Sequence, residues 1–158
     1  MKKILALMCA FALSCLVLVG CGGSGNAVEN KTGLEPGEYT VTVKTDSTMF
    51  AVNEYYNGHG TLTVTKDAAT LHVTLRSTGI CNLDVGKAED AKPSGAVLLE
   101  HGSEMVDWKD GTKPKEAYTF DIPISELGKE FACAIKGTDS GKWYDHTIAV
   151  SDPQPVKK

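Results

Sequence analysis

The residues best suited to chemistry lie in the segment from Lys142 to Val150, near the C-terminal end of the sequence. Its alternating pattern predicts a β-strand, in which successive side chains point to opposite faces. Tyr144 and His146 then share a face with Ile148, which must point into a core. Tyrosine and histidine are both iron ligands, and a phenolate suits ferric iron. The segment therefore predicts a metal-binding pair; the alternative is a structural tyrosine hydrogen-bonded to backbone.

The elements that must position this segment are also predicted to be strands. Apolar and polar residues alternate at residues 39–44, 62–64, 71–75, 118–122 and 131–135. Lys66-Asp67 indicates a hairpin turn, and the only helical candidates are single turns at 88–91 and 125–127. About eight short strands without a long helix predict an all-β fold, an immunoglobulin-like antiparallel β-sandwich.

Residues 1–20 are predicted to be a lipoprotein signal peptide. Lys2 and Lys3 precede an apolar run from Ile4 to Val19, which is shorter than the roughly 20 residues that a spanning helix needs. The run ends in Leu-Val-Gly-Cys, which resembles a lipobox, so Cys21 is expected to become the acylated first residue. The alternative is an uncleaved membrane anchor. We expect a protein held on the extracytoplasmic face of the cell membrane by its lipid.

The remaining chain divides by composition. Residues 21–36 comprise the lipidated cysteine and a glycine-rich, polar stretch that predicts a flexible tether. Residues 37–150 hold the predicted strands and form one domain. Residues 151–158 contain Pro153 and Pro155 and are expected to be a frayed tail.

The charge and the motifs exclude several classes of function. The loss of Lys2 and Lys3 with the signal peptide changes the formal net charge from −4 to −6, and Arg76 is the one arginine. Nucleic acid is therefore not expected as a partner. The sequence contains no HExxH, GxSxG or SxxK motif, and its four histidines are scattered. We do not expect an enzyme.

Two cysteines, Cys81 and Cys133, remain in the domain. An exported domain favours a disulfide, which could stabilise by roughly 4 kcal/mol in the chain-entropy model. The alternative, which we favour, is a pair of buried thiols. Neither cysteine belongs to a CxxC motif, so a zinc or redox site is not expected.

Several segments of the domain resemble the NEAT (near-iron-transporter) domains of bacterial surface haem-uptake proteins. The matching residues are Gly37–Val43, Ser47–Phe50, Leu62–Val64, Tyr118–Pro123 with Leu127, and Trp143–His146. Each match is short, and together they cover most of residues 37–150. A broader group of small NEAT-related lipoproteins, whose ligand the sequence does not assign, is also similar.

The resemblance implies a sandwich that holds haem between a lip segment and the last strand. It assigns the axial iron ligand to Tyr144 and the pocket walls to Met49, Phe50 and His146. The family's second tyrosine falls at Ile148, which has no hydroxyl to support the ligating phenolate.

The expected function is a membrane-anchored ligand-binding lipoprotein that captures haem or another iron compound. Its expected partners are the membrane, through the lipid, and an ABC-type iron or haem transporter. The alternative is a non-haem adhesion or interaction module of the cell envelope with no small-molecule ligand. Apart from haem, no cofactor is expected.

Overall fold

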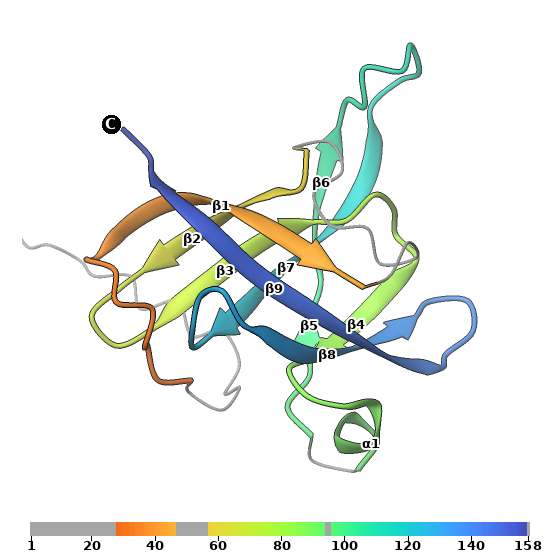
Figure 1. Ribbon diagram of the computed structural model, residues 1–158. Helices are drawn as coiled ribbons and strands as arrows, with labels where there is room; N and C mark the ends of the chain where they lie inside the picture. Colours follow the sequence, from red (N-terminus) through yellow and green to blue (C-terminus); the bar gives the residue numbers. More distant parts are fainter. Residues whose placement is uncertain (1–27, 47–56, 94–95, 158) are drawn as a thin grey trace, which may run out of the picture.

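The computed structural model describes residues 28–46, 57–93 and 96–157 (Figure 1). These ranges contain nine strands and one short helix. In chain order they are β1 (Gly37–Thr45), β2 (His59–Val64), β3 (Ala69–Thr74), β4 (Ile80–Asp84), α1 (Ala88–Ala91), β5 (Leu99–Glu100), β6 (Gly102–Val106), β7 (Lys115–Ile124), β8 (Glu130–Gly137) and β9 (Trp143–Pro155). The paired strands are antiparallel, which confirms the predicted all-β antiparallel fold.

The strands form one sheet that nearly closes on itself. Its hydrogen-bonded order is β5-β4-β8-β9-β1-β2-β3-β7-β6. The two outermost strands, β5 and β6, are separated in the chain by His101 alone. The segment from Leu99 to Val106 therefore runs along both ends of the sheet, pairing first with β4 and then with β7. Because one stretch of chain covers both ends, little sheet edge is left open.

The core follows the alternation that the sequence shows. In β1, Val41 and Val43 are buried while Thr40 and Lys44 are exposed. The same period of two runs through the neighbouring strands, so that one face of each strand contributes to a single apolar cluster. Its largest fully buried members include Phe120, Leu62, Leu71, Leu83, Ile122, Ile124 and Ile148.

The C-terminal strand is longer than the sequence predicted. β9 runs to Pro155, so the expected frayed tail at 151–158 is wrong for residues 151–155. Pro155 is the last residue of the strand, opposite Tyr39. Pro153 is tolerated because the register of the β1–β9 pairing shifts at its position, between Thr40 and Thr42 of β1, and Asp152 takes a positive φ of 53°. Such a bulge removes the demand for a regular backbone donor at a proline. β9 crosses the molecule from its hairpin with β8 to the start of β1 (Figure 1).

Residues 28–36, which we call the strap, are attached to the domain. Asn30 Nδ2 donates to the carbonyl of Thr65 at 3.0 Å, and Lys31 N donates to the carbonyl of Ser125 at 2.9 Å. Leu34 packs against the apolar core. We expected residues 21–36 to be a flexible tether. The strap, which is the described part of that range, instead lies on the β2–β3 turn and the β7–β8 loop.

The two predicted helical turns have different outcomes. Residues 88–91 form α1, whose Ala88 and Ala91 are buried against the sheet. Residues 125–127 are not helical. Within the described ranges, no helix has the length and apolar character needed to cross a bilayer.

Candidate functional site

The face of β9 that carries Tyr144 and His146 is fixed by its pairing with β8. Tyr144 lies opposite Ile135, and His146 lies opposite Cys133. Directly opposed residues of antiparallel strands point to the same face. Ile135 and Cys133 belong to the core, so Tyr144 and His146 lie on the core-side face, as the alternation predicted.

Tyr144 lies at the end of this face, where the core stops. It is 38% exposed, and its hydroxyl donates to Ser140 Oγ at 3.4 Å. Ser140 belongs to the turn between β8 and β9 and also accepts from the backbone N–H of Lys142 at 3.2 Å. A Cβ at Gly137 would lie 2.6 Å from Ser140 Oγ, so the glycine makes room for the serine that contacts the Tyr144 hydroxyl.

Ile148 occupies the position at which the resemblance places a second tyrosine. It is fully buried in the core, opposite Phe131. No hydroxyl comes from that position. The polar partner of Tyr144 is Ser140, four residues before it in the hairpin turn.

His146 is held by Asp46, the residue that follows β1. Asp46 Oδ1 lies 3.2 Å from His146 Nδ1 and accepts from the backbone N–H of Thr147 at 3.1 Å. The His146 side chain is 17% exposed and that of Asp46 is 50% exposed. The hydrogen bond from the Thr147 backbone, followed by the interactions with His146, holds the pKa of the Asp46 carboxyl below its usual range.

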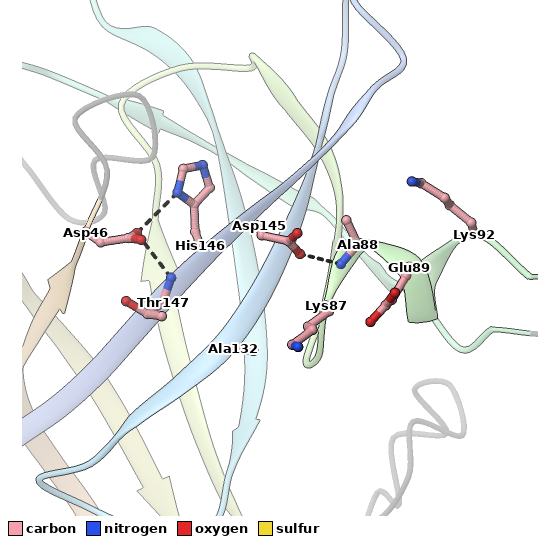
Figure 2. A pocket seen from close by; sticks show the side chains of 9 residues that line it. All are labelled: Asp46, Lys87, Ala88, Glu89, Lys92, Ala132, Asp145, His146 and Thr147. Carbon is pink, nitrogen blue, oxygen red and sulfur yellow. Dashed lines mark hydrogen bonds and ion pairs between the residues drawn. The ribbon is translucent and has the colours of Figure 1, made fainter.

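An open groove of about 520 Å³ runs from Asp46 and His146 to α1 (Figure 2). Its other side is formed by α1 and its flanks, with the charged side chains of Lys87, Glu89 and Lys92. Asp145 joins the two sides because its Oδ1 accepts from the backbone N–H of Ala88 at 2.6 Å. Tyr144 is not among the residues that line this groove.

The two cysteines of the domain are free thiols, but of the buried pair that we favoured from the sequence only Cys133 is buried, and Cys81 is half-buried. Cys133 is fully buried, and burial raises the pKa of its thiol well above the usual range. Cys81 lies beside Lys136, to whose carbonyl its thiol donates at 3.6 Å, three residues along β8 from Cys133.

A second, smaller hollow of about 280 Å³ lies on the polar face of β1, β2 and β3. His59, His72 and Glu104 line it, and His72 Nδ1 lies 2.7 Å from Asp121 Oδ1. Across residues 28–46, 57–93 and 96–157, no group of three or more His, Cys, Asp or Glu side chains could hold a metal ion by itself.

The structure places two of the predicted site residues, Tyr144 and His146, on one face of β9, and of the two only His146 lines the groove. Met49, Phe50 and Cys21 lie outside the described residues. Ser140 and Asp46 were not predicted from the sequence as site residues. Ser140 could have been found from a weak local pattern, a serine in a glycine-containing turn four residues before a strand tyrosine. Asp46 lies 100 residues from His146, so no local pattern links the two.

No protein-family model and no curated protein matches the chain. Among solved structures, the chain is similar to the NEAT5 domain of IsdX2, a hemophore of B. anthracis in complex with heme. The match has 14% sequence identity and a TM-score of 0.46, and it covers 78% of this chain and 100% of that chain.

Proposed function

We propose that this protein is a membrane-anchored lipoprotein that captures haem, or another iron-bearing small molecule, for uptake. The observation that carries the proposal is the pairing of a phenol and an imidazole on one face of β9. Tyr144 and His146 lie two residues apart on the core-side face, where the core ends and both rings reach solvent. Both groups are axial ligands of haem iron in proteins. Tyr144 is the proposed axial ligand.

The missing second tyrosine does not prevent this role. A ligating phenolate needs a hydrogen-bond donor beside it, because that donor stabilises the negative oxygen. The hydroxyl of Ser140 already meets the Tyr144 hydroxyl. A serine hydroxyl both donates and accepts, so it can turn its proton toward a phenolate. Ser140 therefore supplies the function that Ile148 cannot.

The position of the strap supports a role in which the domain displays its ligand. The strap lies where β1 begins and β9 ends, whereas Tyr144 lies at the other end of β9 (Figure 1). At about 3.3 Å per residue the two ends of β9 are at most about 40 Å apart. A lipid on Cys21 would hold the strap end near the membrane and direct the Tyr144 end outward. The proposed partner on the membrane side is an ABC-type transporter.

The proposal is tested by adding hemin to purified residues 22–158 and recording the Soret band. Tyr144→Phe removes the proposed ligand, and we expect it to weaken binding and shift the band. Tyr39→Phe is the matched control, because the Tyr39 hydroxyl donates to the carbonyl of Glu35 at the strap end. We expect this control to bind hemin like the parent.

Two results would contradict the proposal. No Soret band in the parent would refute haem capture and favour the envelope interaction module. A band that is unchanged by Tyr144→Phe would show that Tyr144 is not the ligand.

A further inference from the structure

The carboxylate of Asp46 joins two strands at the edge of the proposed site. One oxygen, Oδ1, receives both the ring N–H of His146 and the backbone N–H of Thr147 (Figure 2). Asp46 is also the residue at which the chain leaves β1. The end of β1 is thus tied to the strand that carries Tyr144 and His146.

The same contact selects one form of the His146 ring. A carboxylate only accepts hydrogen bonds, so Nδ1 must carry a proton to bond with it. In the neutral ring the lone pair then resides on Nε2, the nitrogen that Figure 2 shows turned away from Asp46. Histidines that bind metals are commonly fixed in this way, with a carboxylate on the ring nitrogen that does not bind.

Several other titratable groups lie on the elements around His146, and their described contacts are as follows. Asp145 accepts from the backbone of Ala88. Lys87, Glu89 and Lys92 belong to the opposite side of the groove. Cys133, directly opposite His146 on β8, is a protonated thiol at neutral pH because of its burial. The carboxylate that contacts His146 Nδ1 is that of Asp46.

The protein also contains a second histidine–aspartate pair that serves as an internal reference. His72 Nδ1 and Asp121 Oδ1 are 2.7 Å apart on the polar face of the sheet. Their side chains are 44% and 71% exposed, whereas His146 is 17% exposed. Both pairs join a histidine to an aspartate, but only His146 shares a strand face with Tyr144.

We propose that Asp46 is a positioning residue of the ligand site. It holds His146 through Nδ1, so that the ring stands beside Tyr144 with Nε2 toward the bound ligand. It also fixes the end of β1 against β9. This inference rests on the proposed function, because it concerns the same site and the same iron-bearing ligand.

The first experiment needs no ligand. Nitrogen-15 NMR of the histidine rings, recorded at a pH where they are neutral, reports which ring nitrogen carries the proton. We expect His146 in the Nδ1–H form in the parent and a shift toward Nε2–H in Asp46→Ala. Asp121→Ala is the control: it should change His72 and leave His146 as it was. An unchanged His146 signal in Asp46→Ala would overturn the proposal.

The second experiment measures release of hemin to excess apomyoglobin from the parent and the variants. Loss of a partner that orients a ligand typically costs about 10- to 100-fold in metal affinity. We expect release from Asp46→Ala to be faster by about tenfold, release from Asp46→Asn to be intermediate, and release from Asp121→Ala to match the parent. Asp46→Asn keeps an acceptor oxygen and the side-chain shape, so it separates lost positioning from misfolding.

The outcomes distinguish this inference from the proposed function. If the parent binds hemin and Asp46→Ala releases it at the parent rate, the inference is wrong and haem capture stands. If the parent does not bind hemin, both are wrong.

Discussion

The contact between Gly137, Ser140 and Tyr144 allows a quantitative test of how the hairpin supports the site. In the parent, the alanine Cβ of Gly137→Ala would lie 2.6 Å from Ser140 Oγ, which is too close. Ser140 must then turn away and lose its bonds to the Tyr144 hydroxyl and to the backbone of Lys142. In a Ser140→Ala background the nearest atoms lie at 3.7 Å, an ordinary contact.

The size of the effect follows from these contacts. Each lost hydrogen bond costs about 0.5–1 kcal/mol at this exposure. Alanine in place of glycine in a strand recovers about 0.5–1 kcal/mol of backbone entropy. We therefore expect Gly137→Ala to lower the free energy of unfolding of the parent by up to about 1.5 kcal/mol and to raise that of Ser140→Ala by about 0.5–1 kcal/mol. The coupling between the two positions is then about 1–2 kcal/mol.

Urea unfolding of residues 22–158 and the three variants gives the four free energies of the cycle. The slope of the free energy of unfolding against urea concentration should be the same in all four proteins, because none of the changes alters the surface area exposed on unfolding. A coupling below about 0.5 kcal/mol, the level of additivity for independent sites, would refute the reasoning. In that case Ser140 would not be the fixed partner of Tyr144.

Three further predictions concern the rest of the domain. A thiol reagent at pH 8 should label Cys81 in the folded protein and Cys133 only after unfolding, because burial blocks access to Cys133 and raises its pKa; labelling of both at equal rates would contradict this. Burial, followed by repulsion from Asp90, raises the pKa of Asp84, so its charge destabilises the fold above that pKa. Asp84→Asn should therefore stabilise the protein at pH 7 by less than about 1 kcal/mol. The gain should be lost as the pH falls through the raised pKa of Asp84 towards 3.8, and urea unfolding at pH 7 and at acid pH measures it. Asn30→Ala should lower the free energy of unfolding by about 1 kcal/mol, because Asn30 holds the strap to the β2–β3 turn; no change would indicate a strap that contributes nothing.

Much of the fold could be predicted from local pattern. The alternation of Val41 and Val43 with polar neighbours, and of Leu71 and Val73 with His72, gives strands with one buried face, and the structure has them. The bounds of β9 could not be predicted, because Pro153 argues against a strand unless a bulge accommodates it. The strap was missed because a polar segment looks like a linker until the surface beneath it is known.

The part of the site that lies on a single strand could be predicted from the sequence. A period of two is sufficient to put Tyr144 and His146 on one face with Ile148. The partners of these residues come from elsewhere. Ser140 reaches Tyr144 through the geometry of a turn, and Asp46 reaches His146 through the pairing of β1 with β9.

The sequence alone determined which residues form strands and which side chains share a face, because both depend on neighbours along the chain. Only the tertiary structure decided that the two outermost strands of the sheet are adjacent in the chain at His101, that Ile148 is fully buried in the core and that Asp46 contacts His146. These features depend on strand order and register, which are set by how distant segments bury their apolar faces together. For that reason the iron-ligating residue types could be read from one strand, whereas the carboxylate and hydroxyl that hold them could not.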